Sequence, residues 1–240
     1  MTSDLEQRVL DLVQPHPAVR SVKLVGSRAE GRATERSDWD FCLETDQFEQ
    51  LARTLPELLA PLGPLAQQWD RLATHRCRML MLPGPAKVDL VFPDEAHEPE
   101  PPWLPTADNL AAIDRHFWDW TLWLTSKEAA GRNDRVAAEL KRLSDHLLAP
   151  LGAQTAPASI ADAIDVYRSS PRTGRKPLRG PGLSSPRRRD RGLAHRLASC
   201  VDSIIGNRRR VLLVSSVVVL AAFGTQGSSA RAALRPRLQC

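Results

Sequence analysis

The chain has 240 residues, 42% of them hydrophobic and six of them tryptophan, so it can form one full-sized domain or two small ones, and global disorder is excluded. Its formal net charge of +5 is unevenly placed, because residues 1–166 hold 17 basic and 26 acidic side chains whereas residues 167–240 hold 16 basic and two acidic ones. An acidic first part repels phosphate backbones, which argues against a nucleic acid as partner.

The cysteines and the N-terminus indicate the cellular compartment. The four cysteines form no C-x-x-C pair and lie at no metal-ligand spacing with histidine, so we expect neither a disulfide framework nor a zinc site. The first 13 residues are acidic and amphipathic, without the basic-then-apolar order of a signal peptide. We therefore expect a cytoplasmic protein.

The first part of the chain, residues 1–92, alternates between helical and strand patterns. Apolar residues at helical spacing predict a helix that ends before Pro15, and a second helix runs from Phe48 to Leu59. Period-two alternation predicts strands at residues 21–25, 38–44, 65–72, 77–82 and 87–92. The pattern predicts an α+β palm, in which helices flank a mixed sheet.

A second unit follows the palm. Residues 93–106 are rich in Pro and Glu, which is typical of a linker. Helical periodicity then covers Asn109–Lys127 and Arg132–Leu148, and a third helix starts at Ile160. We therefore expect a helical domain over residues 107–166, and this domain could be incomplete.

The composition changes abruptly at Tyr167. Arg, Pro, Ser and Gly dominate residues 167–240, so this basic tail cannot build a core and is expected to be disordered. A GC-rich gene read out of frame would give such a composition, and we hold as a hypothesis that the tail is a frameshift product. Its apolar segment, Val211–Gly224, falls short of the ~20 residues that span a bilayer, so a membrane partner is not expected.

Three aspartates in the palm form a candidate metal site. Asp38 and Asp40 are two apart on an expected strand, so both project from one face, and Trp39 projects from the other with the apolar residues that follow it. Asp89 also lies between apolar neighbours on an expected strand. Mg²⁺ prefers hard oxygen ligands and often uses one or two carboxylates, so the three could hold two ions.

A candidate phosphate site lies upstream of these carboxylates. Gly26 and Ser27 end a strand, where the missing side chain lets backbone N–H groups approach phosphate and the hydroxyl adds a donor. Arg28 is adjacent and is assigned to the nucleotide. Arg32 and Arg36 are more typical of solvated loop charges.

The run GSRAEGRATERSDWDFCL, with Asp89 downstream, resembles the DNA polymerase β-type nucleotidyltransferase superfamily. It is similar to the small-molecule side of that superfamily, in particular to stand-alone bacterial aminoglycoside-type nucleotidyltransferases. The resemblance implies that Ser27 holds the triphosphate and that Asp38 and Asp40 bind two magnesium ions. It implies that Asp89 binds the catalytic ion and favours deprotonation of the acceptor hydroxyl.

The activity implied is magnesium-dependent transfer of a nucleoside monophosphate, with ATP as the first choice of donor, to a hydroxyl of a small molecule such as an aminoglycoside. Two alternatives stay open: nucleotidylation of a protein partner, as in antitoxin-like enzymes, and a catalytically impaired orphan or regulatory protein. The aromatic residues of the expected helix at 109–127 are assigned to a core rather than to an acceptor pocket; these are His116, Trp118, Trp120 and Trp123. Lys127 could reach a phosphate or simply complement the helix dipole.

Overall fold

The computed structural model describes residues 2–84 and 86–170. In chain order its elements are α1 (Thr2–Val13), β1 (Val19–Val25), α2 (Gly26–Ala29), β2 (Trp39–Thr45), α3 (Phe48–Leu58), the 3₁₀ helix η1 (Ala60–Leu62), β3 (Ala66–Trp69), β4 (His75–Leu82), β5 (Ala86–Ala96), α4 (Leu110–Ala129), α5 (Asn133–Leu143), the π-helix η2 (Ser144–Leu148) and α6 (Ile160–Ser169).

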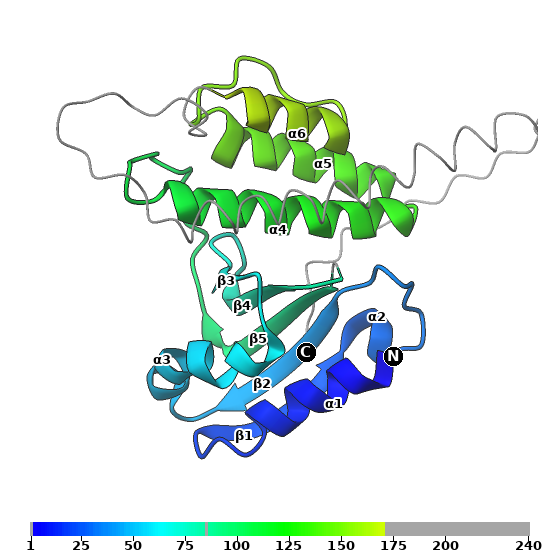
Figure 1. Ribbon diagram of the computed structural model, residues 1–240, viewed down its shortest axis with the longest axis vertical. Helices are drawn as coiled ribbons and strands as arrows, with labels where there is room; N and C mark the ends of the chain where they lie inside the picture. The colour runs from blue at the N-terminus through cyan, green and yellow to red at the C-terminus, as the bar shows by residue number, and fades with distance from the viewer. Residues whose placement is uncertain (1, 85, 171–240) are drawn as a thin grey trace, which may run out of the picture.

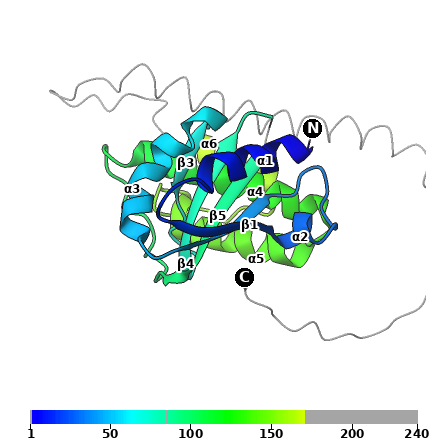
Figure 2. The same cartoon turned by 90° about the horizontal axis from the view of Figure 1, so that it is seen from below.

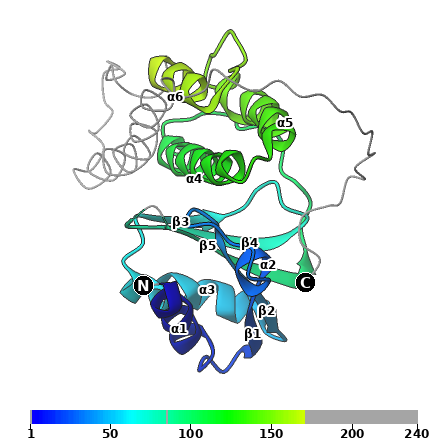
Figure 3. The ribbon, with the colours of Figure 1, turned by 90° about the vertical axis from the view of Figure 1, so that its right-hand side faces the viewer.

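The five strands form one mixed sheet in the order β1-β2-β5-β4-β3. β2 and β5 run parallel and the other neighbours are antiparallel, which confirms the expected mixed sheet. Helices α1 and α3 cover one face of the sheet, as seen from below in Figure 2. Helix α4 crosses the opposite face, and α5 and α6 lie beyond it (Figures 1 and 3).

The chain buries its apolar side chains in two cores, one on each side of the sheet. The palm core lies between the sheet and helices α1 and α3, and β2 contributes Trp39, Phe41 and Leu43 to it, as the alternating pattern predicts. The second core lies between α4, α5 and α6, and it also includes Ala66 of β3 and Met81 of β4. Helix α4 therefore packs on the sheet and closes its second face.

The linker begins later than the sequence suggests. β5 continues to Ala96, so residues 93–96 belong to the sheet and not to the linker. Arg76 pairs with Phe92 whereas His75 pairs with Ala96, which leaves Pro93 in an irregularity of the ladder, where a missing N–H is tolerated.

The linker that remains is fastened to the helical unit. The guanidinium of Arg71 lies 3.6 Å from the centre of the Trp103 ring, and the backbone N–H of Trp103 donates to the carbonyl oxygen of His146 at 3.0 Å.

The helix expected at 132–148 divides into α5 and η2. In η2 the backbone N–H of Ala149 donates to the carbonyl oxygen of Ser144, five residues back, which is the wider spacing of a π-helix.

The helical unit extends past the boundary expected at residue 166. Tyr167, in α6, is 6% exposed, and its ring stacks on Phe117 of α4 with the centroids 3.7 Å apart. Its hydroxyl donates to Asp114 Oδ1 at 2.7 Å. The change in composition therefore falls inside a packed helix, and the rest of the tail, with Val211–Gly224, lies outside the described residues. In the part of the chain that the structure describes, no helix is long and apolar enough to cross a membrane.

Candidate active site

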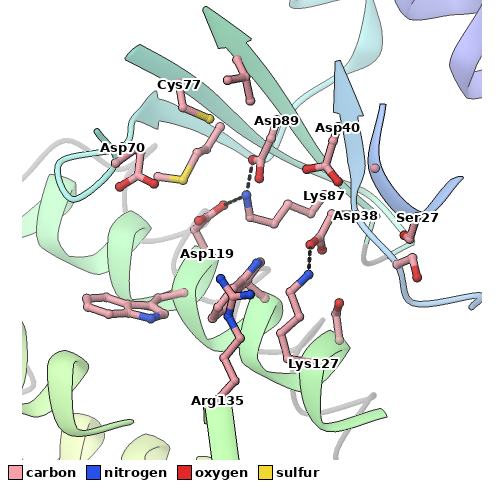
Figure 4. A pocket seen from close by; sticks show the side chains of 18 of the residues that line it. Ser27, Asp38, Asp40, Asp70, Cys77, Lys87, Asp89, Asp119, Lys127 and Arg135 are labelled. Atoms are coloured by element: carbon pink, nitrogen blue, oxygen red, sulfur yellow. Dashed lines mark hydrogen bonds and ion pairs between the residues drawn. The ribbon is translucent and has the colours of Figure 1, made fainter. Parts of the chain in front are cut away.

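The register of β2 and β5 brings two of the three candidate carboxylates together. Asp40 and Asp89 are direct partners across this parallel pair. Their neighbours Trp39 and Val88, also paired, point into the palm core. The two carboxylates therefore leave the sheet on the face that α4 covers, and Asp38 lines the same cavity from the residue that precedes β2 (Figure 4).

Gly26 meets this carboxylate group at the end of β1. Its φ of +71° lies in the left-handed region, and a Cβ atom added there would come within 2.8 Å of Asp40 Oδ2. Any larger residue would therefore be strained and would push the carboxylate away. Gly26 and Ser27 line the same cavity as the three aspartates, so the predicted phosphate site and the predicted metal site coincide in space.

The cavity lies between the sheet and the helical unit and has a volume of about 610 Å³. This size is within the ~300–1,000 Å³ typical of small-molecule sites. Helix α4 contributes Asp119, Trp120, Trp123 and Lys127 to its wall. The tryptophans that the sequence assigns to a core are indeed buried, and two of them also line the cavity.

The structure places Arg28 away from the cavity. Its Nε donates to the carbonyl oxygens of Ser37 and Asp38 at 3.1 and 3.0 Å, and its guanidinium lies 3.9 Å from the centre of the Trp39 ring. Burial lowers its pKa, against the opposing effect of Asp38 and Asp40. Arg28 therefore fixes the backbone at Asp38, and the nucleotide-binding role expected of it has no support in this geometry.

The other two arginines of this loop differ from each other. Arg32 lines the cavity and pairs with Glu30, whereas Arg36 is not part of the lining. Helix α5 adds Arg135, which lies 5.1 Å from the centre of the Trp123 ring. The cationic groups around a bound anion would thus come from two separate units of the fold.

Two lysines contact the candidate carboxylates. Lys127 Nζ lies 2.8 Å from Asp38 Oδ2. Lys87, which is 3% exposed, pairs with Asp89 on its own strand and lies 3.6 Å from Asp119 Oδ1 on α4 (Figure 4). Sequence reasoning missed Lys87, although its position two residues before Asp89 places both on one face of a strand. No local signal could have found Asp119.

The crowding of charge shifts several pKa values. Burial, with the nearby charges of Asp89 and Asp38, raises the pKa of Asp40 to about 7. Burial also raises the pKa of Asp119 to about 7, although Lys87 lowers it. For Lys87 the effect of burial is outweighed by the carboxylates, Asp119 first, and its pKa stands well above the ordinary value.

The arrangement and the partners of the three candidate aspartates bear on whether they could bind a metal ion. Within residues 2–84 and 86–170, no three Asp, Glu, His or Cys side chains stand in an arrangement that could hold a metal, and the ammonium groups of Lys87 and Lys127 pair with two of the three aspartates. The donor set still fits a hard divalent cation, because three carboxylates converge on one cavity and the charges of Asp89 and Asp38 help to raise the pKa of Asp40. A divalent cation would relieve that repulsion once the ammonium groups had moved.

Comparison with solved structures gives distant similarities. The chain is similar to a cytoplasmic RNA terminal U-transferase (22% identity, 38% of this chain and 29% of that chain, TM-score 0.31) and to the Cid1 poly(U) polymerase (18% identity, 50% and 38%, TM-score 0.31). It is also similar to an aminoglycoside 6-adenyltransferase from Bacillus subtilis (11% identity, 83% and 89%, TM-score 0.27). The matches thus span less than two fifths of the two RNA-acting enzymes.

Comparison by sequence is more specific. No curated protein matches the chain. Residues 3–103 match the family described as the nucleotidyltransferase domain, and this range contains Gly26, Ser27 and all three candidate aspartates. Over residues 3–103 the chain is therefore similar to nucleotidyltransferase domains.

Proposed function

We propose that this protein transfers a nucleoside monophosphate from a magnesium-bound nucleoside triphosphate, ATP in the first instance, to a hydroxyl of a small molecule. The observation that carries the proposal is the meeting of Asp40 and Asp89 across β2 and β5, beside Gly26 and in one cavity with Ser27. A carboxylate group next to a glycine turn suits a site in which metal ions and phosphate oxygens share ligands.

In this proposal the chain's own residues bind and orient the donor. The hydroxyl of Ser27 and the backbone N–H groups beside it hold phosphate oxygens, and Asp38, Asp40 and Asp89 hold the metal ions. When bound, Mg²⁺ supplies charge neutralisation at the transferred phosphoryl group and favours the ionised form of the acceptor hydroxyl. Arg32 and Arg135 add positive charge for the triphosphate.

A small acceptor is supported by the shape and the charge of the cavity. Helix α4 lines the cavity on the side opposite the sheet, with Trp120 and Trp123 in its wall, and the volume of about 610 Å³ suits a small molecule. Asp70 lies at the end of the cavity away from Ser27 (Figure 4), where its carboxylate would favour an acceptor that carries protonated amines. An amino sugar of the aminoglycoside type has both the amines and the hydroxyls.

The test is to incubate the protein with Mg²⁺, ATP labelled at the α-phosphate and a panel of aminoglycosides, and to separate small molecules from protein. We expect the label on a small molecule, and expect none with the Asp40→Asn variant. Label on a protein, or on an added RNA, would overturn the small-molecule acceptor. Calorimetry that detected no magnesium-dependent binding of ATP would overturn the enzymatic proposal as a whole.

A further inference from the structure

Lys87 lies between two carboxylates that belong to different units of the fold. Asp89, two residues along β5, is part of the proposed metal site, and Asp119 comes from α4 of the helical unit. Lys87 is 3% exposed and borders the cavity together with Asp89 and Asp119, so little of its side chain meets solvent. Its charge must therefore be balanced within the protein.

The two contacts of Lys87 are unequal. With Asp89 it forms both a hydrogen bond and an ion pair, whereas 3.6 Å separates Lys87 Nζ from Asp119 Oδ1. Asp119 is itself 4% exposed, and its buried Oδ1 accepts no hydrogen bond from the described residues. Asp119 thus presents to the ammonium group an oxygen that forms an ion pair with it but accepts no hydrogen bond from the described residues (Figure 4).

A metal ion at Asp89 would compete with this arrangement. A divalent cation and an ammonium group repel each other when both contact one carboxylate, and the repulsion is strong in a buried site. For Asp89 to serve as a metal ligand, the ammonium must withdraw while keeping a counter-ion. A shift of about 0.8 Å would shorten the Lys87–Asp119 separation to the ~2.8 Å of a charge-assisted hydrogen bond.

We propose that Asp119 is a positioning residue that receives the ammonium group of Lys87 and so releases Asp89 to the metal–triphosphate complex. The inference rests on the proposed function, because it assumes that Asp89 binds a metal ion. It gives helix α4 a part in metal binding although α4 supplies no proposed metal ligand. No covalent step is involved, only the exchange of one ion pair for another.

Removing the acceptor should make Lys87 a stronger competitor of the metal. In Asp119→Asn the ammonium remains with Asp89, and we expect the Kd for Mn²⁺ to rise about tenfold, the size of coupling typical of residues in one ion-pair network. In the double variant Lys87→Met/Asp119→Asn the competing cation is gone. Its Kd for Mn²⁺ should return to the wild-type value or fall below it.

The experiment is a calorimetric titration of the full-length protein with Mn²⁺ in the presence of a non-hydrolysable ATP analogue. The matched control is Glu139→Gln, which disturbs another buried carboxylate of the helical unit: Glu139 accepts from Trp120 Nε1 at 3.2 Å and pairs with Arg142 at 3.1 Å. We expect its Kd for Mn²⁺ to stay within twofold of wild type. Urea unfolding of each variant verifies that the folded state is populated.

The outcomes separate the two proposals. If wild type binds no Mn²⁺ with the analogue, the proposed function fails. If wild type binds but Asp119→Asn has the same Kd within twofold, the role of Asp119 is overturned and the proposed function stands. The role is overturned as well if Glu139→Gln weakens Mn²⁺ binding equally, or if the double variant binds as weakly as Asp119→Asn alone.

Discussion

The Nζ atom of Lys127, near the end of α4, lies 2.8 Å from Oδ2 of Asp38, 89 positions earlier in the sequence. Asp38 is 4% exposed, so Lys127 supplies the charge that a buried carboxylate needs when no metal is bound. The pair also ties the helical unit to the palm at the entrance to β2.

Replacing Lys127 by Met should destabilise the metal-free protein by about 1–3 kcal/mol, because it leaves the Asp38 carboxylate buried without its partner. Mg²⁺ should restore part of the loss, since a cation at Asp38 replaces the missing charge. Urea unfolding with and without Mg²⁺ measures both effects. Lys141→Met is the control: Lys141 pairs with Asp145 at the surface of α5 at 2.6 Å, and its loss should cost under ~0.5 kcal/mol.

Asp38→Asn and Asp40→Asn should each lower kcat on the order of 100-fold or more while the protein stays folded, because both carboxylates face the cavity and neither packs in the palm core. Labelled-ATP transfer to an acceptor measures the loss. Asp46→Asn is a suitable control, since Asp46 pairs with Arg20 at the surface. Near wild-type transfer by either cavity variant would refute the metal-site assignment.

Asp40 should make the stability of the metal-free protein depend on pH. Its pKa is raised from 3.8 to about 7, so between these values the folded state holds a proton that the unfolded chain has lost. The contribution of Asp40 to stability is therefore full at low pH and is lost as pH rises through about 7. In EDTA, the unfolding free energy of Asp40→Asn should fall less steeply from pH 5 to pH 7 than that of wild type, and an unchanged slope would contradict the raised pKa.

Trp39→Ala should cost about 3–5 kcal/mol of unfolding free energy, the usual penalty for removing a large buried aromatic side chain. Trp39 is 6% exposed in the palm core, and its ring also carries the guanidinium of Arg28. Leu104, which is 83% exposed, provides the comparison, because Leu104→Ala should change stability by less than ~0.5 kcal/mol. A Trp39→Ala protein as stable as wild type would place this side chain outside the core.

Two truncated proteins that differ in length by only four residues should differ in stability. Deleting residues 171–240 should leave magnesium-dependent ATP binding unchanged, and it should turn the isoelectric point acidic because it removes 15 of the 33 basic residues. Deleting residues 167–240 also removes Tyr167, with its stacking on Phe117 and its hydrogen bond to Asp114, and should cost about 3–5 kcal/mol. Loss of ATP binding in the shorter deletion would show that the tail belongs to the site.

The sequence by itself determined the palm and its order of elements. Strand alternation is a local property, so the burial of Trp39 and the opposite placement of Asp38 and Asp40 could be predicted from a few neighbouring residues. The match of residues 3–103 to nucleotidyltransferase domains could be predicted for the same reason, since Gly26, Ser27 and the two aspartates lie within 15 residues.

Only the tertiary structure decided which distant groups meet these residues. Lys127 and Asp119 reach the carboxylates because α4 crosses the sheet, and no periodicity within α4 specifies which of its faces meets β2 and β5. Arg28 turns from the cavity because backbone carbonyl oxygens and the Trp39 ring lie within its reach. Tyr167 belongs to the helical core despite the basic sequence that follows it, because burial depends on the ring it stacks against and not on the composition of the segment.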